Sequence, residues 1–375
     1  MVEKLAVSKA QHVILVANLY PDEVDPSKGT FIRTIFQNIQ PVFDRVDVVA
    51  LANTSGGKGP KARAYVRFYV DVLRHLVRYP DALFYPHYVI HSAPPFLLAA
   101  ALGLRRRIVS HTHGSDIVFE GNPGPLVRRL KRFLSGGLMR RSARIIAPSA
   151  YFRDVIVAKY GIPAERMAVS PSGGIDIGVF HPAAEVPAAR ETLHLGFVGR
   201  LTEDKGIHDF LQLIVILEER GVPVRATIVG NGPESAAIQA ASSDRIVHHS
   251  YLPHDELAKI YRVLDFFVFP TRRDSESLGL VGIEAMACGT PVVVYDGAGP
   301  STYVDHGKTG FLVPRGDVQG LADRVIEYSR WGPERRAEMR QSAVRQAKDY
   351  DTEEVNRTLV RILKDVGDSF SRGDA

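Results

Sequence analysis

The stretch that decides the fold runs Asp265-Phe-Phe-Val-Phe-Pro270-Thr-Arg-Arg-Asp-Ser275-Glu-Ser-Leu-Gly-Leu280-Val-Gly-Ile-Glu-Ala285-Met-Ala-Cys-Gly-Thr290-Pro291. It predicts an apolar strand at 266–269, a polar loop that carries Glu276, a helix that starts near 277–280, and a second strand at 292–295. A strand, a loop and a helix with a small, polar start form a common phosphate-binding unit. Paired glutamates are frequent by chance, so the interpretation depends on what other parts of the chain supply.

The size and composition favour a two-domain globular protein. The chain has 375 residues, of which 45% are hydrophobic and 24% charged. It has no apolar run of about 18 residues, and its first ten residues have no apolar core of the signal-peptide type. The single cysteine, Cys288, excludes an intrachain disulfide and fits a reducing compartment. We interpret Cys288 as a packing residue and expect a cytoplasmic protein.

The net charge of +5 is concentrated in the first half of the chain. Twelve lysines and arginines lie between Ala101 and Tyr160, against three acidic residues. The basic region 105–144 suggests an anionic partner, such as a phosphorylated substrate, a membrane surface or nucleic acid. A solvated helix face is the plain alternative. The segment 125–141 reads as an arginine-rich amphipathic helix that could lie on anionic lipid.

The first half begins as a parallel α/β sheet. A strand at 12–18 is followed by Gly29, a helix from Phe31 and a strand at 46–51. The backbone at Gly29 could approach an anion, although a flexible turn would explain the glycine equally well. His113 follows the strand 107–111, at the sheet edge where α/β proteins bind ligands. A purely structural histidine is the alternative there.

The second half repeats this pattern. The segment 182–192 is rich in proline and alanine and lacks an apolar pattern, so we place the interdomain linker there. A strand pattern restarts at Leu193. We therefore expect domains at 1–183 and 184–350, each long enough for its own core. The natural active site of such a protein is the cleft between the two domains.

Two cations mark a candidate anion site in the second half. Arg200 and Lys205 leave the end of a strand five residues apart and suit a diphosphate, although a surface pair would look the same. Gly279, at another helix start in the same sheet, favours the phosphate interpretation. Glu284, on the helix that follows, could accept two hydrogen bonds from a ribose diol.

Other chemistries lack their signatures. The Gly230-Asn-Gly-Pro233 stretch lacks the third glycine of a dinucleotide fingerprint. The chain has no GxxxxGK[ST], HExxH or GxSxG motif and no cysteine cluster. These observations leave a nucleotide-linked substrate, without hydride transfer, ATP hydrolysis or an evident structural metal.

The order of these motifs resembles that of a family 4-type (glycosyl transferases group 1) retaining glycosyltransferase with the GT-B fold. The resemblance spans nearly the whole chain, and its most specific part is the stretch 276–291. One departure is Ser172, where the family usually has an asparagine. The matching pieces are Gly29, His113-Gly114 with Asp116, Gly174-Ile175-Asp176 with Phe180, Gly199-Arg200 with Lys205-Gly206, Gly230-Asn-Gly-Pro233, and Glu276-x-x-Gly-Leu-x-x-x-Glu284 with its tail to Pro291.

The resemblance implies an α/β fold class of two Rossmann-like domains whose parallel sheets face each other across a cleft. Domain 1–183 would bind the acceptor, and domain 184–350 would bind a UDP- or GDP-linked sugar donor. Residues 351–375 would form a C-terminal helix that crosses back to pack on the first domain.

For the donor, the resemblance implies that Arg200 and Lys205 neutralise the diphosphate as it leaves. Glu284 would hold the ribose, and backbone near Gly230 and Leu252 would contact the base. The helix start would give backbone donors to phosphate at Ser277, Gly279 and Leu280.

The resemblance also implies two catalytic residues. Glu276 would approach the hydroxyls of the donor sugar, and His113 would stabilise the reacting centre from the first domain. Gly29 would let its loop approach the donor phosphate or the acceptor. No metal and no cofactor besides the nucleotide sugar are expected.

We therefore expect transfer of a sugar to an acceptor hydroxyl in bacterial envelope glycan, glycolipid or polysaccharide assembly. The acceptor would be a glycan, a lipid-linked molecule or a phosphorylated small molecule, and the protein would be cytoplasmic, with a peripheral position on the inner face of the membrane left open. A GT-B sugar epimerase and a non-catalytic protein that binds nucleotide sugars or nucleic acid remain alternatives. Nucleic acid is disfavoured because the sequence lacks an aromatic-interleaved platform for single strands.

Overall fold

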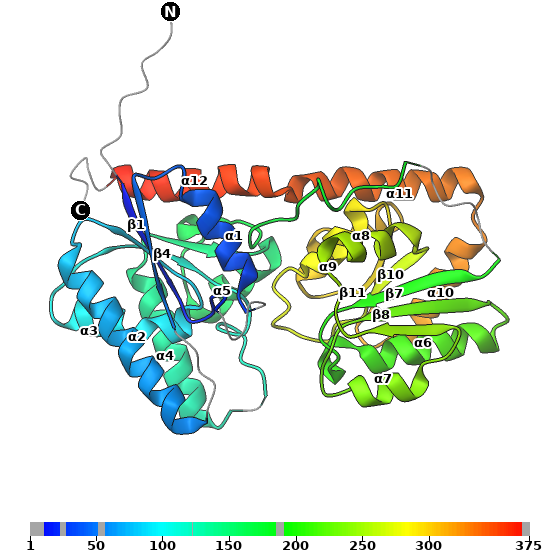
Figure 1. The fold of residues 1–375 in the computed structure, drawn as a ribbon, viewed down its shortest axis with the longest axis horizontal. Helices are drawn as coiled ribbons and strands as arrows, with labels where there is room; N and C mark the ends of the chain where they lie inside the picture. The colour runs from blue at the N-terminus through cyan, green and yellow to red at the C-terminus, as the bar shows by residue number, and fades with distance from the viewer. Residues whose placement is uncertain (1–10, 23–27, 52–56, 122, 185–190, 370–375) are drawn as a thin grey trace, which may run out of the picture. The chain divides into compact units, whose positions relative to one another are not determined.

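The chain folds into two α/β units in this computed structural model (Figure 1). Unit 1 comprises Met1–Gly173 and Val355–Ala375, and unit 2 comprises Gly174–Glu354. The structure describes residues 11–22, 28–51, 57–121, 123–184 and 191–369.

Unit 1 is built on a six-stranded parallel sheet with the strand order β2-β1-β3-β4-β5-β6. The strands are short and apolar, as expected for a parallel sheet covered on both faces. They are β1 (His12–Ala17), β2 (Arg45–Ala50), β3 (Leu83–Pro86), β4 (Arg107–His111), β5 (Arg144–Ala147) and β6 (Met167–Val169).

Helices cover both faces of this sheet. Side chains alternate along β1, so Ile14 and Val16 lie in one core, and Val13 and Leu15 lie in the other. The first core also contains residues of α2, α3, α4 and α5, and the second contains residues of α1. These helices are α1 (Thr30–Ile39), α2 (Lys58–Arg78), α3 (Val89–Ala101), α4 (Pro125–Arg141) and α5 (Ala150–Tyr160).

The last helix of the chain, α12 (Thr352–Ser369), belongs to unit 1 along most of its length. Its Leu359, Leu363 and Val366 are buried in the same core as Val13. Gln11 Nε2 donates a hydrogen bond of 2.7 Å to the Asp368 carboxylate near the end of the helix. Unit 1 is therefore completed by residues that follow unit 2 in the sequence.

Unit 2 has its own six-stranded parallel sheet, with the order β12-β11-β10-β7-β8-β9. Strand order reverses between β7 and β10, and in open α/β sheets ligands bind at the carboxyl ends of the strands beside such a reversal. The strands are β7 (Leu193–Val198), β8 (Val224–Val229), β9 (Ile246–His249), β10 (Phe266–Phe269), β11 (Val292–Tyr295) and β12 (Gly310–Val313).

The helices of unit 2 also lie on both sides of their sheet. One core joins the sheet to α6 and α10, and the other joins it to α8, α9 and α11. The helices are α6 (Ile207–Glu219), α7 (Ser235–Ala241), α8 (His254–Val263), α9 (Leu280–Ala287), α10 (Val318–Ser329) and α11 (Pro333–Ala347). Short 3-10 turns lie at Ala164–Arg166, Glu203–Lys205, Gly299–Thr302 and Lys348–Tyr350.

The boundary between the units differs from the expected position at 183/184. Residues 174–183 belong to unit 2, because Ile175 and Phe180 are buried in the core that contains Tyr261. The guanidinium of Arg262 also donates hydrogen bonds of 2.8 and 2.9 Å to backbone carbonyls of this segment. The expected linker at 182–192 lies partly outside the described residues, as do the first ten residues.

Packing explains two local features. Helix α4 runs through Gly136 and Gly137, and a side chain at Gly137 would come within 3.0 Å of Leu97. The glycines let α4 approach its neighbours closely. Cys288 is buried, and burial raises the pKa of its thiol to about 12, so its environment is that of a packing residue.

Candidate active site

The reversal of strand order in unit 2 brings two loops together. One loop follows β7 and contains Lys205, and the other follows β10 and contains Glu276. The backbones of these loops touch, because a side chain at Gly206 would come within 2.0 Å of the Pro270 carbonyl oxygen. Gly230, after β8, packs equally tightly on Gly199. These glycines therefore have a structural reason to be present, whatever the site binds.

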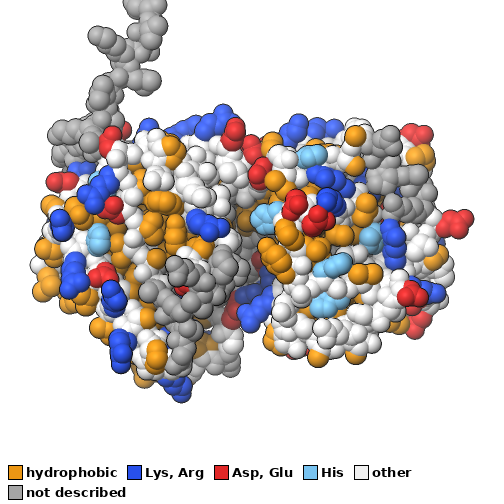
Figure 2. All heavy atoms as spheres, in the orientation of Figure 1, with side chains coloured by type: hydrophobic (Ala, Val, Ile, Leu, Met, Phe, Trp, Pro, Cys, Tyr) orange, Lys and Arg blue, Asp and Glu red, His pale blue; other side chains and the backbone are white. Residues whose placement is uncertain are grey.

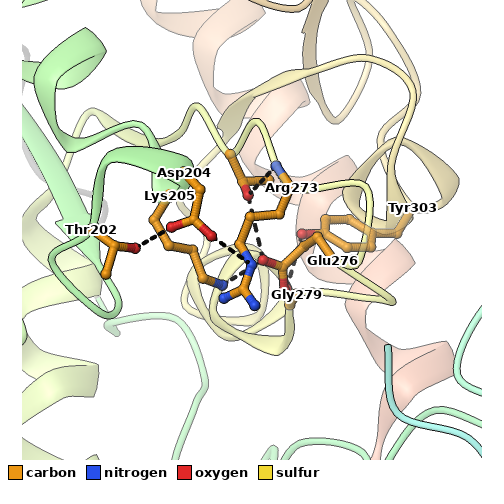
Figure 3. A network of polar contacts seen from close by, with 8 residues as sticks. Thr202, Asp204, Lys205, Arg273, Glu276, Gly279 and Tyr303 are labelled. Atoms are coloured by element: carbon orange, nitrogen blue, oxygen red, sulfur yellow. Dashed lines mark hydrogen bonds and ion pairs between the residues drawn. The ribbon is translucent and has the colours of Figure 1, made fainter. Parts of the chain in front are cut away.

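Lys205 and Glu276 form an ion pair at this point (Figure 3). Both side chains are nearly buried, with 15% and 12% of their surface exposed. Thr271 Oγ1 lies 3.4 Å from the same carboxylate oxygen, and the Lys205 ammonium lies 5.3 Å from the centre of the Phe269 ring. The pair places a positive and a negative group where both have few other partners, so an arriving anion can replace Glu276 as the partner of Lys205.

Neighbouring arginines are held by acidic residues. Arg273 Nε lies 3.1 Å from Asp204 Oδ2, and Thr202 donates a hydrogen bond to the other oxygen of Asp204 (Figure 3). Arg272 donates two hydrogen bonds, of 2.8 and 2.7 Å, to Asp209. The cations next to the pair are thus already neutralised in place.

Arg200 differs from these arginines. Its side chain is exposed and, among the residues that the structure describes, it has no hydrogen bond or ion pair. Arg200 and Lys205 do not contact each other, because Lys205 turns to Glu276 instead. The two predicted phosphate ligands therefore start from different states, one free in solvent and one paired.

Helix α9 starts beside the ion pair, at Leu280. Gly279 precedes it with a positive φ of 82°, and a side chain there would come within 2.5 Å of the Phe269 ring. Tyr303 donates a hydrogen bond of 3.0 Å to the Gly279 carbonyl. Ser277 and Leu280 are both half-buried. The first amide groups of this helix are therefore held next to Glu276, where they can bind an anion.

Glu284 lies one turn further along α9. Its carboxylate is half-buried and accepts a hydrogen bond of 3.2 Å from the Tyr261 hydroxyl. Burial raises the pKa of Glu284 to about 7. Leu252 is partly buried against the core that contains Tyr261. Near neutral pH, Glu284 is thus poised to gain donors from a ligand that carries hydroxyls.

His113 in unit 1 lies in a cluster of rings. Its Nε2 is 2.9 Å from Nδ1 of His87, and its ring packs on Tyr88 and Phe31 with centroid distances of 4.6 and 5.0 Å. Its Nδ1 is 3.5 Å from the hydroxyl of Ser172. Burial lowers the pKa of His87 and of His113 well below 6.5, so both rings are neutral at physiological pH.

The backbone around His113 is fixed by Asp116. Its carboxylate accepts hydrogen bonds of 3.0 Å from the backbone amides of His113 and Val89. The contact with the Val89 amide lies at the start of α3. Gly29 precedes α1 with a φ of 65°, and a side chain there would meet the Leu19 carbonyl at 2.7 Å.

Comparison with known proteins identifies the family. Residues 8–177 match the family described as Glycosyltransferase Family 4, and residues 184–346 match Glycosyl transferases group 1. The chain is 30% identical to a Salmonella typhimurium protein named as the colanic acid biosynthesis glycosyltransferase WcaL, over 74% of this chain and 70% of that one. The chain belongs to the family 4 glycosyltransferases. It is also 28% identical to the D-inositol 3-phosphate glycosyltransferase of Paenarthrobacter aurescens, over 71% of each chain.

Solved structures show the same fold. This glycosyltransferase aligns with sucrose-phosphate synthase from Thermosynechococcus elongatus with a TM-score of 0.78 and 17% identity, over 96% of this chain and 100% of that one. Alr3699/HepE from Anabaena, in complex with UDP-glucose, aligns with a TM-score of 0.72 and 19% identity, over 94% and 99%. The predicted GT-B fold is confirmed.

The histidine cluster extends beyond the predicted residue. His111 Nδ1 lies 2.6 Å from the Tyr85 hydroxyl, and one nitrogen from each of His87, His111 and His113 lies within 4.8 Å of the other two. Such a group could hold a metal ion, but the rings of His111 and His113 stack with an interplanar angle of 26°. A metal binds in the plane of an imidazole, so these rings would have to rotate to share one. We therefore interpret the cluster as a hydrogen-bonded support for His113.

The predicted residues fall into two groups. His113 and Gly29 belong to unit 1, where Phe31, at the start of α1, connects them. In unit 2 the structure brings Lys205 and Glu276 into direct contact beside Gly279. Sequence reasoning missed His87, which follows β3 as His113 follows β4. That shared position after a strand was the available signal.

Proposed function

We propose that unit 2 binds a nucleotide diphosphate sugar and that the protein transfers the sugar, with retention of configuration, to an acceptor hydroxyl. The observation that carries this proposal is the Lys205–Glu276 pair beside the start of α9. It combines a cation, a carboxylate and the amides of a helix start at the strand-order reversal of a parallel sheet. A diphosphate with a sugar attached needs all three.

The diphosphate is proposed to replace Glu276 as the partner of Lys205. Arg200, which is exposed and unpaired in the described part of the chain, closes on the phosphate from solvent. The amides at Ser277, Gly279 and Leu280 add hydrogen bonds from the helix start. Glu276, released from Lys205, accepts hydrogen bonds from sugar hydroxyls. These groups stabilise the charge that develops on the leaving diphosphate, so we propose that the reaction needs no metal ion.

The nucleoside is proposed to lie over α9. The Glu284 carboxylate accepts hydrogen bonds from both ribose hydroxyls, and the base packs near Gly230 and Leu252. UDP is our first choice of nucleotide, since the structural neighbour Alr3699/HepE binds UDP-glucose. GDP remains the second choice.

His113 is proposed to act on the reacting sugar as a neutral hydrogen-bond donor. The Nε2 of His87 is buried without a partner, whereas its Nδ1 faces His113. A buried N–H without an acceptor is costly, so we assign the His87 proton to Nδ1, which donates to Nε2 of His113. His113 then carries its own proton on Nδ1, 3.5 Å from the Ser172 hydroxyl, and a ligand oxygen is proposed to replace that hydroxyl as its acceptor. His87 is thus a positioning residue.

In the proposed reaction, the bond between the anomeric carbon and the phosphate oxygen breaks as the acceptor oxygen bonds to the same carbon. The acceptor hydroxyl passes its proton to the phosphate oxygen that leaves. Attack on the leaving-group face retains the configuration, and no side-chain nucleophile is used. Lys205 and Arg200 stabilise the transferred charge throughout.

The acceptor is proposed to carry a negative charge. The basic surface of unit 1 supports this, and one relative is named for D-inositol 3-phosphate. We propose a phosphorylated or lipid-linked acceptor in bacterial envelope glycan assembly, handled on the cytoplasmic side of the membrane. The name of the WcaL relative refers to colanic acid biosynthesis.

The proposal is tested first by a thermal-shift screen with UDP-, GDP- and ADP-sugars. A donor at a hundredfold excess over its Kd should stabilise the protein by about 2.7 kcal/mol. Lys205→Met/Glu276→Gln should remove that shift, whereas Lys308→Met, which changes an exposed lysine of unit 2, should keep it. A shift that survives in the double variant would contradict the assigned site.

Product analysis then tests the reaction. Incubation with the stabilising donor and candidate acceptors should give a sugar joined to the acceptor with its anomeric configuration retained. Free sugar of altered stereochemistry would instead support an epimerase. Nucleotide binding without any product across a broad acceptor panel would favour a non-catalytic protein.

A further inference from the structure

Exposed apolar side chains occur on two helices of unit 1. Val66 and Val70 on α2, and Leu126, Leu130 and Phe133 on α4, are all exposed. Helix α3 contacts both α2 and α4, so these side chains belong to one side of the unit. Large exposed apolar groups usually mark a surface that is covered by something else.

Helix α4 is divided into an exposed half and a buried half. Every residue from 124 to 130 is exposed, whereas Ser135 to Met139 are buried. Gly136 and Gly137 let the buried half pack tightly against Tyr160 and Leu97. The first two turns therefore project from the unit on a firmly anchored base, as the lower left part of Figure 1 shows for α4.

The projecting half carries a continuous apolar stripe. Leu126, Leu130 and Phe133 follow one another at spacings of four and three residues, which places them on one face of a helix. Their exposed fractions are 79%, 56% and 62%. Side chains of this size are rarely so exposed unless a partner covers them.

Cations surround this stripe. Arg129 borders the stripe, whereas Arg128, Lys131 and Arg132 lie on the other faces of the same turns. Residues 125–141 contain no acidic residue. On α2, exposed basic residues such as Arg63 and Arg67 flank the exposed valines, and Asp71 is its one acid. Figure 2 shows lysine and arginine side chains interspersed with hydrophobic ones over this part of unit 1.

We propose that the first half of α4, together with the adjoining face of α2, docks on an anionic lipid bilayer. Leu126, Leu130 and Phe133 enter the region below the headgroups, and Arg128, Arg129 and Arg132 bind lipid phosphates. An apolar stripe bordered by cations is what interfacial helices present to such a membrane. A helix that crosses the bilayer is not involved, since none of those in the described ranges is long and apolar enough.

A membrane fits this surface better than a protein or nucleic acid does. The helix turns that bear the stripe protrude from the unit, and a fluid bilayer can deform to accommodate a protruding helix. Nucleic acid would be bound by the cations but would leave Leu126, Leu130 and Phe133 in water. The proposal is independent of the donor chemistry above, and it would bring the protein to a lipid-linked acceptor.

The test is co-sedimentation of the full chain with vesicles of phosphatidylcholine alone or of phosphatidylcholine with about 30% of the anionic lipid phosphatidylglycerol. The protein should bind the anionic vesicles at low salt and bind the neutral ones weakly. The variant Leu126→Ser/Leu130→Ser/Phe133→Ser should lower binding about tenfold or more, and Arg128→Glu/Arg129→Glu/Arg132→Glu should lower it at least as much.

Matched controls come from exposed positions elsewhere. Val215→Ser and Val247→Ser remove exposed apolar groups from unit 2, and Arg225→Glu/Arg330→Glu/Arg361→Glu makes the same change in net charge. These variants should keep at least half of the binding. Equal losses in the controls, or equal binding to both vesicle types, would overturn the proposal. So would a loss caused by the arginine changes alone, since insertion of the apolar stripe would then be absent.

Failure here is distinguishable from failure of the donor site. All of these variants change exposed side chains, so they should keep the wild-type Tm and the stabilisation by nucleotide sugar. A variant that loses vesicle binding but keeps both properties assigns the loss to the docking surface itself.

Discussion

The carboxyl ends of the two sheets differ in the charge of their side chains. In unit 2 that edge holds charged pairs, with Lys205 on Glu276 and Arg273 on Asp204. In unit 1 it holds His87 and His113, which burial keeps neutral. A charged site can exchange one ionic partner for another, whereas a neutral, hydrogen-bonded site keeps one protonation state. The first property suits the binding and release of a diphosphate. The second suits a hydrogen-bond donor that must keep its proton.

The largest effect is expected from removing the positive charge of Lys205 in unit 2. Lys205→Met should lower kcat/KM about 10³-fold, because the leaving diphosphate loses its main positive partner. A single change leaves Glu276 unpaired in a nearly buried place and should cost about 3–5 kcal/mol of stability. The double variant Lys205→Met/Glu276→Gln should recover stability, measured by thermal unfolding, but not activity. Recovery of activity in the double variant would show that Lys205 serves folding alone.

The next test removes His113, the proposed neutral hydrogen-bond donor of unit 1. His113→Ala should lower kcat about 10²-fold, within the range for loss of a positioned proton-transfer or hydrogen-bonding group. The Kd of the nucleotide, measured by calorimetry, should stay within about twofold, because the nucleotide is proposed to bind unit 2 and His113 belongs to unit 1. His75→Ala, in the last turn of α2, is the control. A large loss of nucleotide affinity would move His113 from catalysis to binding.

A smaller effect should follow from changing the support of His113. His87→Leu removes the hydrogen bond to Nε2 and should lower kcat about tenfold, while His87→Asn, which keeps a donor near Nδ1, should restore most of it. The pH profile separates positioning from packing. The pKa of His113 is now held well below 6.5 by burial, with His87 and His111 nearby. In His87→Leu, Nε2 of His113 no longer accepts a hydrogen bond and can take up a proton instead, so that pKa should rise. The acidic limb of the profile should then move to higher pH in His87→Leu only.

The smallest predicted effect concerns Glu284 in unit 2, a carboxyl whose pKa is raised to about 7 by burial. Its pKa of about 7 means that the carboxyl is largely protonated at pH 6 and ionised at pH 8. Ribose hydroxyls bind better to the ionised form, so nucleotide affinity should rise about fivefold from pH 6 to pH 8. Glu284→Gln should show no such rise in calorimetric titrations. An unchanged slope in the variant would place the ribose elsewhere.

Stability should show the opposite trend for the same residue. The folded-state pKa of Glu284 lies above its ordinary value of 4.5, so its contribution to stability is complete below about pH 4.5 and is lost as the pH rises through about 7. Comparison of Tm values for the wild type and Glu284→Gln across this range isolates the effect. The glutamine variant should be the more stable of the two at pH 8.

Local patterns were enough to predict much of the fold. The strands at 266–269 and 292–295 were recognised because buried parallel strands are short, uninterrupted apolar runs bounded by proline and glycine. The helix between them starts at Leu280, close to the expected position, since Gly279 with its positive φ ends the loop. Each of these features depends on neighbours in the sequence.

The contacts that were missed depend on distant residues. The ion pair of Lys205 with Glu276 arises because β7 and β10 are neighbours, and strand order is not a local property. Sequence reasoning paired Lys205 with Arg200 by proximity along the chain. The start of α3 also depends on a distant residue, since the Asp116 carboxylate that accepts a hydrogen bond from the Val89 amide comes from 27 residues further on. The boundary at Gly173 was hidden because Phe180 packs against α8.

The position of α12 has a consequence for how the protein is made. Leu359, Leu363 and Val366 fill one core of unit 1, yet the ribosome synthesises them after the whole of unit 2. Unit 2 can complete its core while the chain still grows, but β1 and α1 expose one apolar face until Val366 has emerged. During synthesis that face is open to chaperones and to other nascent chains. A premature stop before Val355 would therefore leave a finished unit 2 attached to an unfinished, aggregation-prone unit 1.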